Sequence, residues 1–69
     1  MACEEKQRLG VEYDAATARF AAAVTELQRK MGTSSKSEFE RLSRAADEAR
    51  VRSEQARLAL EQHIAAHDC

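Results

Sequence analysis

The sequence predicts an all-α fold: an antiparallel, coiled-coil-like two-helix hairpin that dimerises into a four-helix bundle. Its composition favours helices, because the 69 residues include no Pro, no Trp and only two Gly and are dominated by helix formers such as Ala, Glu, Arg and Leu. Apolar residues recur in alternating steps of three and four along two long segments, which is the heptad pattern of packed helices. A single strong break, the stretch MGTSSKSEFERL, separates the two segments.

The first helix is expected at about residues 3–31. Its apolar positions all fall on one face: Leu9, Tyr13, Ala16, Phe20, Ala23 and Leu27. The segment ends in the basic residues Arg29 and Lys30, as the last turn of a helix commonly does. Gly32 follows and fits a C′ glycine in the left-handed backbone conformation. The other glycine, Gly10, lies within the helix and costs about 1 kcal/mol relative to Ala.

The turn between the helices is expected at residues 32–35. Ser35 fits an N-cap, and Glu38 three residues later completes a capping box. Ser37 with Glu40 gives a second frame for the same helix start, because helix boundaries vary by a residue or two. Both frames predict a helix, a short turn and a second helix.

The second helix is expected at about residues 36–67, with its own apolar face: Phe39, Leu42, Ala46, Ala49, Ser53, Ala56 and Leu60. Folding it antiparallel onto the first helix gives six layers: Leu9 with Leu60, Tyr13 with Ala56, Ala16 with Ser53, Phe20 with Ala49, Ala23 with Ala46, and Leu27 with Leu42. Tyr13 and Phe20 then each face an alanine, as interdigitation requires. The register also brings Arg19 near Arg52, and helical spacing predicts a Glu48–Arg52 ion pair among others.

We call the contact formed by these six layers the seam. A second apolar stripe lies away from it. Its members are Val11, Ala15, Ala18 and Ala22 in the first helix and Val51 and Leu58 in the second. A single core gives a chain of this size only a few kcal/mol of stability, so a partner is commonly needed. We therefore expect a homodimer, or docking on another helical protein, with this stripe as the contact surface. The alternative is that Ala serves only as a helix former and that scattered exposed aliphatic residues are normal.

Two cysteines and two histidines gather at the open end of the predicted hairpin. The register places Cys3, His63, His67 and Cys69 there, with the two histidines four residues apart on one helix face. Three interpretations stay open. In the first the histidines are solvated and both thiols are free; in the second a Cys3–Cys69 disulfide ties the ends. In the third the four side chains bind zinc or another transition metal, because two Cys and two His are a known ligand set.

Charge and composition narrow the functional classes. Eleven basic and twelve acidic residues give a net charge of -1, which provides no electrostatic footprint for nucleic acid or an anionic membrane. No apolar run approaches the roughly 20 residues of a membrane span. The N-terminal residues lack a signal-peptide core, so a cytoplasmic location is expected. With no pocket, phosphate loop or nucleophile motif, we expect neither an enzyme nor a small-molecule substrate or resident cofactor.

The sequence therefore favours a structural or protein-interaction module. A small metal- or redox-responsive protein, in which the end cluster locks or releases the hairpin, is the first alternative. RNA binding is the second. In size and layout the chain resembles the bacterial Rop protein, a helical hairpin that dimerises into a four-helix bundle and binds RNA. The resemblance implies RNA binding and is carried by layout alone, without a shared motif.

Overall fold

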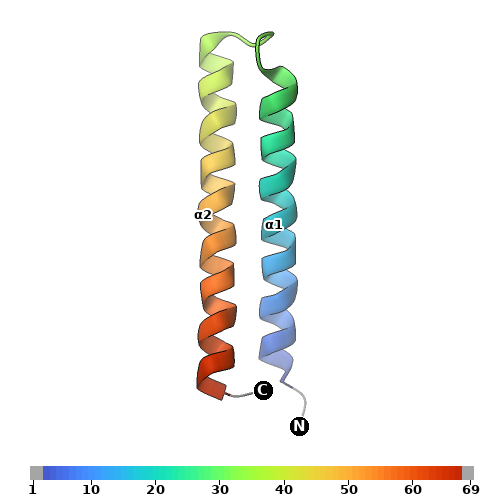
Figure 1. Cartoon of the computed structure of the whole chain (residues 1–69), viewed down its shortest axis with the longest axis vertical. Coiled ribbons are helices and arrows are strands. Elements are labelled where there is room, and N and C mark those ends of the chain that lie inside the picture. The colour runs from blue at the N-terminus through green and yellow to red at the C-terminus, as the bar shows by residue number, and fades with distance from the viewer. Residues whose placement is uncertain (1–2, 68–69) are drawn as a thin grey trace.

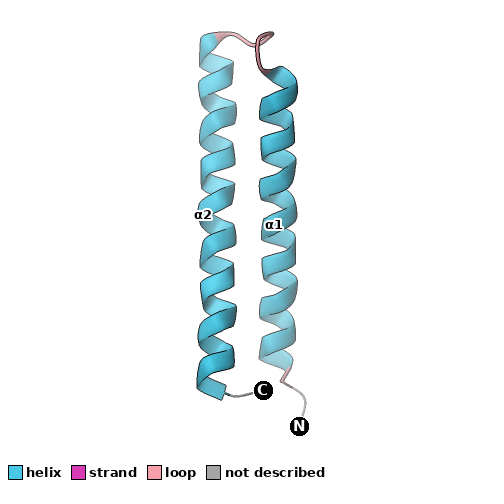
Figure 2. Cartoon of the chain, viewed as in Figure 1, coloured by secondary structure: helices cyan, strands magenta, loops and turns pink. Residues whose placement is uncertain are grey.

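The structure is a computed structural model that describes residues 3–67. Helix α1 spans Glu4–Lys30 and helix α2 spans Lys36–His67, and the two pack antiparallel side by side (Figure 1). Figure 2 shows helix on either side of one short turn, and the described part of the chain contains no strand. The molecule is a rod 53 Å long, and the expected two-helix hairpin is confirmed. Neither described helix is long and apolar enough to cross a membrane.

Hydrogen bonds near the turn fix where each helix ends. Gly32 has a φ of 85°, the left-handed conformation expected of it. The Lys30 carbonyl accepts hydrogen bonds from the backbone N–H of Ser34 at 3.1 Å and from the Ser34 hydroxyl at 2.7 Å. Ser34, which lies beyond α1, thus supplies hydrogen-bond donors to a carbonyl group in the last turn of α1. Ser35 Oγ accepts the Glu38 backbone N–H at 3.2 Å, which makes Ser35 the N-cap of α2. Of the two N-caps predicted for this helix start, Ser35 is observed, while the Glu38 carboxylate of the predicted capping box pairs with Lys30.

The seam between the helices is the core of the molecule. All the residues of the six expected layers are buried or half-buried. Leu9 and Ala46 are the most enclosed of the described residues, with 9% and 7% of their surface exposed. Phe39, which extends the apolar pattern toward the turn, is still 36% exposed. One seam therefore covers one side of each helix and leaves the other sides in solvent.

Two broad faces flank the seam, and the spacing along each helix decides which residues lie on which face. A residue three positions after a seam residue is rotated by about 60° to one side, and a residue four positions after it by about 40° to the other. Lys30 follows Leu27 by three residues, and Glu38 precedes Leu42 by four. Lys30 Nζ and Glu38 Oε1 form an ion pair of 3.8 Å. Residues three positions after, or four before, a seam residue of either helix therefore lie on a common side of the hairpin.

We name the two faces by what they carry. The groove face is the side of the Lys30–Glu38 ion pair, and it also includes Arg19 and Arg52, each three residues after a seam alanine. The apolar face is the opposite side, where residues lie four positions after, or three before, a seam residue. Its large apolar members are Val24, Met31, Phe39 and Ile64, and it also carries the ion-paired arginines Arg50 and Arg57 of α2.

Candidate interaction surfaces

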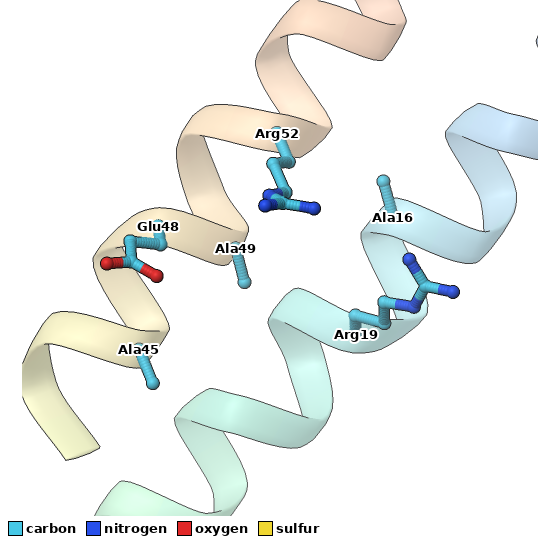
Figure 3. Close-up of a pocket in the computed structure, with 6 residues that line it drawn as sticks. All are labelled: Ala16, Arg19, Ala45, Glu48, Ala49 and Arg52. Atoms are coloured by element: carbon cyan, nitrogen blue, oxygen red, sulfur yellow. The ribbon is translucent and has the colours of Figure 1, made fainter. Parts of the chain in front are cut away.

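The groove face carries a hollow near the middle of the hairpin. Both helices line it: Ala16 and Arg19 of α1, and Ala45, Glu48, Ala49 and Arg52 of α2 (Figure 3). The cavity measures about 220 Å³. Alanine methyl groups leave this space open because they are too short to fill the gap between the two backbones. Arg19 and Arg52 border the same cavity, as the register predicts.

The eight arginines divide into two equal groups, and within the described residues the two arginines of the groove belong to the group that forms no ion pair, together with Arg41 and Arg44. Four arginines each bind a carboxylate three or four residues away on the same helix: Arg8, Arg29, Arg50 and Arg57. The hydrogen bond from Arg50 to Asp47, for example, raises the pKa of Arg50. Within residues 3–67, neither Arg19 nor Arg52 forms an ion pair. The expected Glu48–Arg52 pair is not formed, although both side chains come from α2 and border the same cavity (Figure 3).

The apolar face gathers large side chains near both ends of the rod. Met31 is 58% exposed, Ile64 41% and Phe39 36%, while Val24 is half-buried. A second hollow of about 530 Å³ opens beside Phe39 and is lined by Phe39, Glu40, Ser43, Arg44 and Asp47. The contact stripe predicted from the sequence contains none of these four large apolar residues. The signal was present, because Met31 and Ile64 each lie four residues after a seam leucine.

The second stripe is split between the two narrow edges of the hairpin. All six members are exposed: Val11, Ala15, Ala18, Ala22, Val51 and Leu58. Val11 lies two residues after Leu9 and Val51 two residues after Ala49, so each is rotated by about 200° from the seam of its own helix. The two halves of the stripe therefore point away from each other, and a single partner cannot cover both. As a contact surface the stripe stays a prediction.

The open end brings Cys3 against His63. Cys3 Sγ lies 2.8 Å from His63 Nε2, and the rings of His63 and His67 lie 4.5 Å apart at an angle of 32°. The Cys3 sulfur is thus engaged, in contrast to the interpretation with free thiols. Among residues 3–67, no three His, Cys, Asp or Glu side chains gather into a group that could hold a metal ion. Cys69 lies outside the described residues, so the Cys3–Cys69 disulfide and the four-ligand metal site stay predictions.

Comparison with known proteins assigns no family to this arrangement. No protein-family model matches the chain, and neither a curated protein nor a solved structure matches it significantly. The surfaces of the hairpin itself are therefore the basis for a function.

Proposed function

We propose that the hairpin is a protein-interaction module that self-associates through its apolar face to form a four-helix bundle. The observation that carries this proposal is the amount of surface left exposed. The hairpin has a mass of 7.7 kDa and exposes 5254 Å², whereas a compact monomer of that mass exposes about 4300 Å². The excess of roughly 900 Å² is close to the roughly 800 Å² that each partner buries in a stable complex.

The small size of the core is a second reason to expect that another hairpin packs against this one. Of the described residues, only Leu9 and Ala46 are buried. A core this small supplies only a few kcal/mol, and natural chains of this length commonly obtain the rest from a partner, a metal or a covalent tie. A second hairpin on the apolar face would cover the seam from one side and bury Met31 and Ile64, which are among the most exposed large apolar side chains.

The apolar face is complementary to itself under a two-fold axis. Phe39 is the fourth residue of α2 and Ile64 is the fourth from its end, so both lie equally far from the middle of the helix. A two-fold axis that crosses the middle of the hairpin sets Ile64 of one copy opposite Phe39 of the second copy. The hollow beside Phe39 then receives this aliphatic side chain in the manner of a knob entering a hole.

Sedimentation velocity over a range of protein concentrations tests this proposal. The wild-type chain should sediment as a dimer, and the double variant Met31→Glu, Ile64→Glu should sediment as a monomer because four buried carboxylates oppose association. The matched control is Ala18→Glu, Ala22→Glu, which places the same charges on the edge stripe and should remain dimeric. Both substituted pairs are exposed in the hairpin, so circular dichroism should report unchanged helix content.

Two outcomes would contradict the proposed assembly. A wild-type monomer at high concentration would remove self-association altogether. Dissociation by the Ala18→Glu, Ala22→Glu variant, with no effect of the apolar-face variant, would move the contact to the edge stripe.

A second candidate function is favoured by the contact between Cys3 and His63. We propose, as this alternative, that the open end is a lock that closes through a Cys3–Cys69 disulfide or a bound transition metal. The 2.8 Å separation of Cys3 Sγ and His63 Nε2 brings together two side chain types that bind zinc and take part in thiol chemistry. In this case the melting temperature should fall when a reductant or a chelator opens the lock.

A further inference from the structure

We propose that the groove face binds a carboxylate on a partner helix, held between Arg19 and Arg52. The site would accept one acidic side chain, Asp or Glu, from a helix that packs along the cavity between α1 and α2. It lies on the opposite side of the seam from the apolar face. The proposal therefore does not depend on self-association.

The first step of the argument is the position of the two positive charges. Arg19 comes from α1 and Arg52 from α2, and both border one cavity of about 220 Å³. Both side chains are exposed, and two positive charges on the same face repel each other. A negative group placed between them would remove this repulsion and form charge-assisted hydrogen bonds with both, which guanidinium geometry favours.

The second step is the lack of a carboxylate for these two arginines within the described residues. Arg50 and Arg57 on the same helix as Arg52 each bind acidic side chains one helical turn away. Glu48 stands one turn before Arg52 in the same way and lines the same cavity, but it forms no ion pair with either arginine within the described residues. The donors of Arg52 therefore stay available to a group that enters from outside.

The third step is the shape of the floor. Ala16, Ala45 and Ala49 line the cavity between the two arginines. Small side chains at a helix surface let a second backbone approach closely, as in the alternation of large and small residues across a packed interface. A helix laid along this floor could place a Glu or Asp side chain at the level of Arg19 and Arg52.

The fourth step is the charge balance, which favours a carboxylate over a phosphate. The lining holds two arginines and one glutamate, so a single negative charge neutralises it. Glu12 and Glu26 lie seven residues before and after Arg19, which places them on nearly the same side of α1. Glu12 and Glu26 are paired with Arg8 and Arg29, so the surface on either side of the groove offers no continuous positive strip to an extended polyanion such as RNA.

The test uses two synthetic Ala-rich helical peptides that are identical except for Glu or Gln at the central position. Binding to the full chain is measured by isothermal titration calorimetry. The Glu peptide should bind about tenfold more tightly than the Gln peptide, as expected for charge-assisted hydrogen bonds at a partly exposed site. In the double variant Arg19→Gln, Arg52→Gln the two peptides should bind equally. Glu48→Gln should strengthen binding of the Glu peptide, because it removes a competing carboxylate.

A matched control is the double variant Arg29→Gln, Arg44→Gln, which removes the same number of positive charges outside the groove and should keep the preference for Glu. Equal affinities of the wild-type chain for both peptides, or no binding of either, would overturn the proposal. Tighter binding of a single-stranded RNA oligonucleotide or of inorganic phosphate, lost in Arg19→Gln, Arg52→Gln, would also overturn it, because the groove would then be a phosphate site. Circular dichroism of each variant shows whether the hairpin has kept its helices.

Discussion

The turn end of the hairpin is held by bonds between residues at most eight positions apart, whereas the open end is held by a contact between residues 60 positions apart. At the turn, Ser34 caps the Lys30 carbonyl, Ser35 caps α2, and Lys30 pairs with Glu38. At the open end, Cys3 meets His63, and that contact exists only when the whole seam holds the helices in register.

This difference implies that the two ends respond to different perturbations. The turn is held by hydrogen bonds of backbone and hydroxyl groups and by one ion pair, none of which depends on oxidant or reductant. The open end carries the sulfur of Cys3 and the imidazole of His63, side chains whose bonding changes with redox conditions and with available metal ions. Substitutions at the turn should therefore shift stability by a constant amount, while substitutions at the open end should have effects that depend on solution conditions.

Cys3→Ser at the open end carries the largest expected effect. If a Cys3–Cys69 disulfide closes the chain, its loss should lower the free energy of unfolding by about 2–4 kcal/mol, because a cross-link over a long loop restricts the unfolded chain. Urea unfolding followed by circular dichroism measures this difference in the absence of reductant. Adding reductant should bring the wild-type chain to the level of the variant and should leave Cys3→Ser unchanged.

Cys69→Ser is the matched control for this prediction and should behave as Cys3→Ser does. Equal stability of the wild-type chain and both variants, with and without reductant, would contradict a covalent tie. If a chelator rather than a reductant lowers the stability of the wild-type chain, the lock is a metal site.

The heptad pattern and the two turn signals were sufficient to predict the hairpin. Alternating steps of three and four identified the seam, and Gly32 and Ser35 identified the turn, because each has a strong preference for one backbone role. The ion pairs could not be predicted in the same way. Helical spacing predicted a Glu48–Arg52 pair that is not formed, and it gave no preference for the observed pairs of Arg50 with Asp47 and Glu54. Several carboxylates lie within reach of each exposed arginine, and the alternatives differ by only a few tenths of a kcal/mol.

The surfaces were predicted less completely than the seam. The second stripe follows from apolar residues left over by the heptad pattern, but a one-dimensional list does not show that Val11 and Val51 lie on opposite edges. The groove could be anticipated in part, since the register placed Arg19 near Arg52. The cavity between them depends on where the Glu48 side chain lies, and the sequence leaves several rotamers of an exposed glutamate nearly equal in energy.

Gly32→Ala at the turn end should have the second largest effect. Gly32 has a φ of 85°, and an L-residue in the left-handed region costs about 1–2 kcal/mol. A Cβ at this position would meet no atom within 4 Å, so the loss would be conformational and free of steric clash. Chemical denaturation should show this decrease equally with and without reductant, in contrast to Cys3→Ser.

Gly10→Ala provides a control with the opposite sign. Gly10 lies within α1, and a Cβ there would also meet no atom within 4 Å. The substitution should therefore raise the free energy of unfolding by about 1 kcal/mol, the difference in helix propensity between Ala and Gly. A Gly32→Ala variant as stable as the wild-type chain would contradict the left-handed cap, and a destabilised Gly10→Ala would indicate that this position packs against something other than solvent.

Ser35→Ala should have the smallest effect of the three, about 1 kcal/mol, because it removes the side-chain acceptor of the Glu38 backbone N–H. Ser37→Ala is the matched control: its hydroxyl lies 3.4 Å from that of Ser35 and does not cap the helix, so its loss should change stability by less than about 0.5 kcal/mol. Denaturation in parallel distinguishes the two. A larger loss for Ser37→Ala than for Ser35→Ala would mean that α2 begins in the second frame in solution. Because both residues lie at the turn end, neither loss should change when reductant or chelator is added. A dependence on either reagent would show that the two ends of the hairpin are coupled through the seam.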